Sequence, residues 1–277
     1  MLREIFVPLL NGASDDAALD AAAALALAHD AHVSALVTLE HPLPLVSELG
    51  TLPPDITRGQ IEQAREVALA RVANAEQRLA REAISSEVRL SELMMLWSEE
   101  TAAWQARHAD LTVLGGADGS NAHAGLNFRS LLLRSGRPVL IVPAAARVIA
   151  PAQRPVLAWK PTPEATRAIH DALPLLAPGA ELDVLVVDPT VSEHDYGEEP
   201  GAAIARHLAR HGLRVRVVSL PSAGRNTGEA ILQHTRERGA DLLVMGGYGH
   251  SRWREVVLGG ATHSALAGAN LPVLFAH

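Results

Sequence analysis

The chain contains one structural unit twice, and this internal repeat restricts the possible folds more than any other feature of the sequence. In the first half the residues RHAD, ending at Asp110, lead into the apolar run LTVLGG. In the second half RGAD, ending at Asp241, leads into LLVMGG. Further on, Pro138 and Pro272 each precede another apolar run, VLIV and VLF. Two copies of one fold therefore make up most of the 277 residues.

Each half is an alternation of apolar strands and helices. Continuous apolar strands that alternate with helices indicate a parallel sheet covered by helices on both faces. The sequence predicts opening strands at Glu4–Pro8 and Arg154–Ala158, helices at Asp15–Ala28 and Pro163–Leu176, second strands at Val33–Leu39 and Leu182–Val187, and third strands at Val88–Leu90 and Val215–Leu220. We therefore predict an α/β fold of two tandem, doubly wound, five-stranded parallel sheets with helices on both faces, related by a pseudo-twofold axis.

The two units meet near Ala144–Arg154, a segment of mixed composition with a proline before the next strand. We therefore predict an N-terminal domain at residues 1–143 and a C-terminal domain at residues 155–277. The first domain carries about eighteen extra residues between its second and third strands. There we expect a proline-rich loop at His41–Asp55 and a long helix at Ile61–Ile84. A lid or brace packed on the sheet is the favoured interpretation, and a functional loop is the alternative.

Composition and charge exclude several classes of protein. Apolar residues make up 48% of the chain and aromatic residues 3%, which indicates a globular protein with cores built mostly from Ala, Leu and Val. The net charge of −7 gives no broad positive surface for nucleic acid. Because the chain has no cysteine, disulfides and thiol nucleophiles are excluded. The apolar runs, such as Ala21–Ala28, fall short of the roughly 18 residues that span a bilayer, so we expect a cytoplasmic protein without a membrane partner.

The segment DLLVMGGYGHSRWREVVLGGAT carries the strongest indication of a binding site. Its apolar run stops at Gly246 and Gly249, and after nine more residues Gly259 and Gly260 lead into a helical segment. The N-terminus of a helix after a glycine loop has free backbone N–H groups and favours an anion. Glycine also lets the backbone approach a phosphate closely, because it has no Cβ. The alternative is that these glycines only form tight turns.

This spacing, Gly-x2-Gly-x9-Gly, resembles the hallmark of the universal stress protein family, in which Ser or Thr follows. Here Gly260 stands in place of the hydroxyl residue. The resemblance covers nearly the whole chain and implies a tandem member of the family. It also implies that the final strands of the two units, Pro138–Val142 and Pro272–Phe275, pair with each other. That pairing is physically reasonable, because apolar edge strands left open invite aggregation.

In family members that bind ATP, the glycine segment wraps the ribose and the phosphates. The resemblance places the nucleotide site of this chain in its C-terminal half, at Ala158, Trp159, Lys160, Val186, Met245, Gly246, Gly249, Gly259, Gly260 and Ala261. Lys160 stands where many nucleotide binders have aspartate, and an ammonium group cannot accept hydrogen bonds from adenine or ribose. Trp159 either stacks on a base or fills the pocket.

The glycine motif of the first half has decayed. Gly115, Gly116 and Gly119 remain, but Arg129 stands at the position that corresponds to Gly259 of the second half. The segment Asn11-Gly12 retains something like the family's Asp-Gly at the end of the first strand. We interpret this half as structural.

The remaining polar residues indicate no catalytic chemistry. His250, Arg252 and His263 lie near the glycine segment, where they either neutralise a phosphate or are ordinary surface residues. Ser251 and Ser264 belong to no recognisable nucleophile motif, so a hydrolytic triad has no support. The 13 histidines are scattered, and we expect no protein-ligated metal, although Mg²⁺ could accompany a nucleotide.

Three functional interpretations follow. The first is a stress-response regulatory protein, not an enzyme, with an adenine nucleotide such as ATP in its C-terminal half. The second is a scaffold of the same family that has lost nucleotide binding and acts through protein partners. The third and weakest is an ATP hydrolase. The protein partners are not named by the sequence, and both a monomer and a homodimer stay open.

Overall fold

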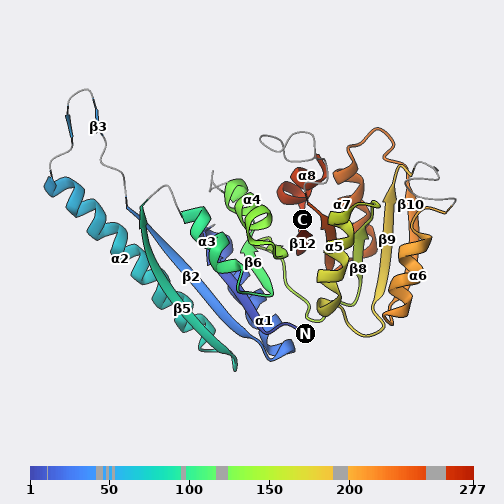
Figure 1. Cartoon of the computed structure of the whole chain (residues 1–277), viewed down its shortest axis with the longest axis horizontal. Coiled ribbons are helices and arrows are strands. Elements are labelled where there is room, and N and C mark those ends of the chain that lie inside the picture. Colours follow the sequence, from blue (N-terminus) through green and yellow to red (C-terminus); the bar gives the residue numbers. More distant parts are fainter. Residues whose placement is uncertain are drawn as a thin grey trace.

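A computed structural model describes residues 1–10, 12–41, 46–47, 50–51, 54–94, 98–116, 124–189, 199–247 and 260–277. Within these residues ten strands form one sheet in the order β10-β9-β8-β11-β12-β7-β6-β1-β2-β5 (Figure 1). The first half supplies β1 (Glu4–Leu9), β2 (His32–His41), β5 (Ser85–Met94), β6 (Leu111–Gly115) and β7 (Val139–Val142). The second supplies β8 (Pro155–Ala158), β9 (Glu181–Val187), β10 (Arg214–Leu220), β11 (Leu242–Gly246) and β12 (Val273–Ala276). The strand order is the same in both halves, outward from the centre.

The predicted doubly wound α/β fold is confirmed, with the two five-stranded sheets joined into one. Neighbouring strands within each half are parallel, whereas β12 and β7 pair antiparallel at the centre, with Leu274 opposite Leu140. The final strands of the two units therefore meet as expected, and each covers the edge of the other. The domain boundaries at 1–143 and 155–277 stay a prediction.

Helices cover both faces of the sheet and enclose two apolar cores. One core lies under α1 (Asp15–His29), α2 (Pro54–Leu79), α5 (Pro163–Ala172) and α6 (Ala202–Arg210). The other lies under α3 (Ser98–Ala106), α4 (Ala124–Ser135), α7 (Thr227–Arg238) and α8 (Gly260–Gly268). Successive strand residues alternate between the two, as Leu274 and Phe275 do. Each core contains residues of both halves, so the halves fold around shared apolar layers.

Several predicted boundaries shift. The helix predicted at Pro163–Leu176 ends at Ala172 and continues as a 3-10 turn, because Pro174 has no N–H for a helical hydrogen bond. The long helix predicted at Ile61–Ile84 begins earlier, at Pro54, and proline is favoured in the first turn of a helix. The predicted loop before it contains the short antiparallel pair β3 (Val46–Ser47) and β4 (Gly50–Thr51).

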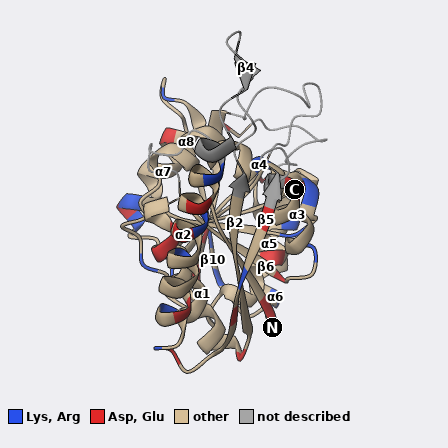
Figure 2. Ribbon diagram, turned by 90° about the vertical axis from the view of Figure 1, so that its left-hand side faces the viewer, with Lys and Arg blue, Asp and Glu red and all other residues tan. Residues whose placement is uncertain are grey.

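The inserted helix α2 braces the N-terminal half. Ala68, Ala75 and Leu79 lie at helical spacing and are buried in the core shared with α1. Arg78 makes a bidentate ion pair with Asp20 of α1, at 2.6 and 2.7 Å, and its third nitrogen lies 3.1 Å from Asp16. Acidic and basic residues are interspersed along this side of the molecule (Figure 2). The structure therefore favours the brace over a lid.

The repeated aspartates, which end the RHAD and RGAD segments, fasten the first strand of each half. The carboxylate of Asp241 accepts hydrogen bonds from the backbone N–H groups of Gln153 (2.7 Å) and Arg154 (2.9 Å). In the same way Asp110 accepts from the N–H groups of Arg3 (2.7 Å) and Glu4 (3.1 Å). The repeat thus preserves a structural contact.

We expect Asp241→Ala to lower the free energy of unfolding by about 1–3 kcal/mol, because two backbone donors lose their acceptor in a part-buried position. Asp110→Ala should cost less, because its contacts are more exposed to water. Urea denaturation measures both. The exposed helical control Glu62→Ala should change the value by less than about 0.5 kcal/mol. An Asp241→Ala protein as stable as the control would contradict this role.

Candidate functional site

The topology of the C-terminal half creates one position suited to a ligand. Strand β8 lies between β9 and β11, and the chain leaves β8 and β11 toward opposite sides of the sheet. In open α/β sheets, ligands bind outside the carboxyl ends of the strands at such a switch point. Ala158, the last residue of β8, lies opposite Met245 in the register, and Gly246 ends β11. The structure thus brings the predicted strand-end residues together.

Only glycine fits at position 246, because the backbone of α5 lies too close for a side chain. A Cβ at this position would lie 2.6 Å from the backbone N of Ala165 and 2.8 Å from the carbonyl carbon of Glu164. Both atoms belong to the first turn of α5, which Thr162 caps by accepting a hydrogen bond from the N–H of Ala165. The start of α5 therefore lies directly on the end of β11, with Gly246 as the point of contact.

A carboxylate oxygen without a partner lies at the same place. The Cβ of Glu164 is 3.0 Å from the position of a Cβ on Gly246. Within the described residues, Oε2 of Glu164 is buried and accepts no hydrogen bond. An unsatisfied buried acceptor costs about 1–3 kcal/mol, so this oxygen is prepared to accept a hydrogen bond from a ligand. Sequence reasoning missed Glu164, because no motif marks it.

Lys160 and Trp159 take different environments at the end of β8. Lys160 is exposed, and its carbonyl accepts a hydrogen bond from the N–H of Thr162 at 2.7 Å. The Trp159 side chain is partly buried against the core under α5 and α6, and the backbone N–H of Trp159 donates to the carbonyl of Leu185. This placement favours packing over base stacking for the indole.

The other predicted residues divide into three groups. Val186 and Met245 are buried in the two cores, so only their backbone atoms can face a ligand. Gly260 begins α8 with open space around its Cβ position, and Ala261 packs against Gly228 of α7. The residues that lie outside the described part of the chain are Gly249, Gly259, His250, Ser251 and Arg252.

The corresponding place in the N-terminal half is closed. A Cβ on Gly115 would lie 2.6 Å from Oγ of Ser14, and that hydroxyl donates to the carbonyl of Gly116 at 2.7 Å. Arg71 of the inserted helix reaches the end of β1, where its Nη2 donates to the carbonyl of Leu9 (2.6 Å) and lies 3.0 Å from the buried Asp15 carboxylate. Arg71 therefore occupies the switch point of this half, which supports its structural interpretation. Gly119 lies outside the described residues.

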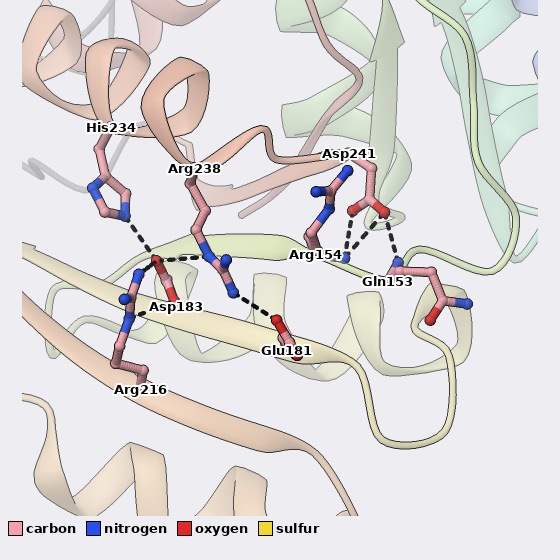
Figure 3. Close-up of polar contacts among 8 residues, drawn as sticks. All are labelled: Gln153, Arg154, Glu181, Asp183, Arg216, His234, Arg238 and Asp241. Atoms are coloured by element: carbon pink, nitrogen blue, oxygen red, sulfur yellow. Dashed lines mark hydrogen bonds and ion pairs between the residues drawn. The ribbon is translucent and has the colours of Figure 1, made fainter.

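A buried charged cluster lies at the start of β9, away from the carboxyl ends of the strands (Figure 3). Asp183 is 1% exposed, and its carboxylate accepts hydrogen bonds from His234 (2.9 Å) and Arg216 (2.6 and 3.1 Å). Arg238 lies 3.4 Å from Asp183 and donates to Glu181 at 2.9 Å. Burial acts to raise the pKa of Asp183, but the hydrogen bonds from Arg216 and His234 outweigh it and hold that pKa below its usual value. This cluster ties α7 to two strands and is structural.

No helix in the described part of the chain is both long enough and apolar enough to cross a membrane. No three or more of its His, Asp and Glu side chains are arranged to hold a metal ion together.

Known proteins resemble this chain in sequence and in fold. The model of the universal stress protein family matches residues 152–277. The universal stress protein Slr1230 of Synechocystis is 25% identical over 160 residues, which are 56% of this chain and 52% of that protein, so the match spans about half of this relative.

Two crystal structures share the fold over 99% of this chain. A universal stress protein from Archaeoglobus fulgidus matches with a TM-score of 0.67 and 17% identity over 95% of its length. The protein PA1789 from Pseudomonas aeruginosa, described as functionally unknown, matches with a TM-score of 0.58 and 16% identity over 92%. The universal stress protein family is thus matched by the C-terminal half of this chain, residues 152–277, and the N-terminal half repeats the same strand order.

Proposed function

We propose that this chain is a stress-response regulatory protein that binds an adenine nucleotide at the switch point of its C-terminal half. The phosphates would lie over Gly246–Gly249 and Gly259–Ala261, next to the start of α8. The ribose or the base would lie at the ends of β8 and β9, near Ala158 and Val186. The nucleotide supplies no reaction in this proposal; its presence or absence changes how the protein engages its partners.

The observation that carries the proposal is Oε2 of Glu164 beside Gly246, which is buried and has no hydrogen-bond partner among the described residues. Lys160 replaces the acceptor that many nucleotide binders have at this strand end. Glu164 offers a different acceptor beside Gly246, at the end of the neighbouring strand β11, and a ribose hydroxyl or an adenine amino group can donate to it. The asymmetry between the halves agrees with this assignment, because Arg71 occupies the equivalent strand end in the N-terminal half.

The main alternative is a scaffold that binds no nucleotide. The partly buried position of Trp159 favours this alternative, since an indole packed against the core is not free to stack on a base. Weak ATP hydrolysis has no positioned base or nucleophile in the described residues to support it.

The test is calorimetry with ATP on the full chain. We expect Glu164→Ala to weaken ATP binding by about tenfold or more, because a hydrogen bond to a charged group contributes about 1.5–3 kcal/mol. Gly249→Val or Gly259→Val should abolish binding by blocking the close approach of the phosphates. The double variant Gly260→Ser with Lys160→Asp should bind ATP more tightly, since it restores a hydroxyl donor and an acceptor.

The matched control lies in the N-terminal half. Gly125 has open space around its Cβ position, so Gly125→Ala should leave both the fold and ATP binding unchanged. Gly116 is a poorer control, because a Cβ there would lie 3.0 Å from Pro143. If the native chain and the double variant both release no heat with ATP while their circular dichroism is unchanged, the scaffold interpretation replaces this proposal.

A further inference from the structure

Three histidines meet between two helices on the outer part of the C-terminal half. His170 lies on α5, and His207 and His211 lie one turn apart on α6 or at its end (Figure 1 shows both helices). The Nε2 atoms of His207 and His170 are 3.2 Å apart, and the ring of His207 also packs on that of His211, with centroids 4.8 Å apart. The segment HLARH, His207 to His211, has the His-x3-His spacing that places two side chains on one helix face.

The orientation of His170 is fixed by the backbone. Its Nδ1 lies 2.8 Å from the carbonyl oxygen of Thr166. A carbonyl only accepts, so Nδ1 carries the proton and donates it, and Nε2 is left with a free lone pair that points toward His207. Metal-binding histidines in proteins are commonly held in this way, by a hydrogen bond from the second ring nitrogen to a carbonyl or carboxylate.

The spacing of the two nitrogens suits a metal ion. Two nitrogens on one tetrahedral Zn²⁺, each bonded at about 2.0–2.1 Å, lie about 3.3 Å apart. The observed separation is 3.2 Å.

We propose that His170 and His207 form a binding site for a divalent transition-metal ion such as Zn²⁺ or Cu²⁺. Water would fill the remaining coordination positions of the ion. Without metal, Nε2–H of His207 donates to Nε2 of His170. When the ion binds, His207 changes to the neutral tautomer with the proton on Nδ1, so both Nε2 lone pairs bond to the metal and neither neutral ring loses a proton. The ion then ties α5 to α6.

The experiment uses the untagged full chain after treatment with a chelator. Calorimetry with ZnCl2 and with CuCl2 should show one ion per chain, with Cu²⁺ bound more tightly than Zn²⁺. His170→Asn and His207→Asn should each weaken Zn²⁺ binding at least about tenfold. Mutation of a residue that only hydrogen-bonds to a metal ligand commonly causes a loss of that size, so loss of a ligand should cause at least as much. Each variant should also abolish the rise in melting temperature that Zn²⁺ produces in the native chain.

The control variant is His108→Asn, an exposed histidine of the other half, which should bind Zn²⁺ like the native chain. Nitrogen NMR of the imidazole rings gives a second measurement, in which Zn²⁺ should shift Nε2 of His170 and His207 and leave Nδ1 of His170 protonated. Unchanged Zn²⁺ affinity in either of the two variants, or first shifts in other histidines, would overturn the proposal. Melting curves without metal show whether each variant is folded.

Discussion

Gly246→Ala should destabilise the protein by about 3 kcal/mol, because the added methyl group would be forced against backbone rather than against a movable side chain. The nearest atoms are the backbone N of Ala165 and the carbonyl carbon of Glu164, at 2.6 and 2.8 Å. Either α5 must lift away from the end of β11, or β11 must shift within the sheet. The free energy of unfolding from urea denaturation measures the loss.

Two other glycines provide the comparison. Gly115→Ala should destabilise by a similar amount, because its Cβ would meet the backbone carbonyl of Ser14 at 2.7 Å. Gly260→Ala should be neutral or slightly stabilising, since nothing lies within 4 Å and alanine favours the helix by up to about 1 kcal/mol. A Gly246→Ala protein as stable as the native chain would mean that α5 is not seated on β11 as the structure has it.

The second large effect is expected at Asp183, where Asp183→Asn should cost about 3 kcal/mol. Removing one partner of a buried ion pair usually costs about 3–5 kcal/mol, since the remaining charge keeps its burial without compensation. Here the cost falls at the lower end, because Arg216 is 59% exposed and water screens its part of the interaction. The NH2 group of an asparagine at this position would also face His234 or an arginine. These residues donate hydrogen bonds to Asp183, so donor would face donor.

The neighbouring exposed pair is the control. Glu181 is 51% exposed and accepts from Arg238, so Glu181→Gln should cost less than about 1 kcal/mol. Both variants are measured by denaturation at pH 7. If the two variants lost the same free energy of unfolding, burial would not be what makes Asp183 important for stability.

Acid should remove the difference between the native chain and Asp183→Asn. The pKa of Asp183 in the folded protein lies below its unfolded value, which is about 3.9. The stabilisation from the ionised carboxylate is therefore complete above that value and is lost as the pH falls through the folded pKa. Denaturation of both proteins at a series of pH values below about 4 should show their free energies converging.

The repeat and the apolar runs predicted the strand order, because a buried parallel strand leaves a local signal in the sequence. The strand segments at Val33–Leu39 and Val215–Leu220 lie within β2 and β10, and the pairing of the final strands is confirmed. Helix ends were less predictable: the leucines between Leu173 and Leu176 favour a longer helix, but Pro174 ends it.

The polar contacts of the site could not be predicted, because they depend on which distant segments meet. Arg71 reaches Leu9 from 62 positions away, and His207 reaches His170 from 37. In contrast, the pair His207 and His211 was visible in the sequence as a spacing. The glycine motif indicated where a phosphate would lie, but neither Glu164 nor the placement of Trp159 follows from a motif.

The antiparallel pairing of β7 with β12 has an evolutionary consequence. In a symmetric dimer of identical chains, each contact across the twofold axis occurs twice, and any substitution appears on both sides at once. Here Val139 faces Phe275 and Ile141 faces Val273, so the two sides are encoded separately. A mutation such as one that brought Arg71 to the end of β1 could therefore close one half while selection kept the other open. The two copies in the tandem chain can therefore take different roles. Because they are covalently linked, their pairing does not depend on protein concentration.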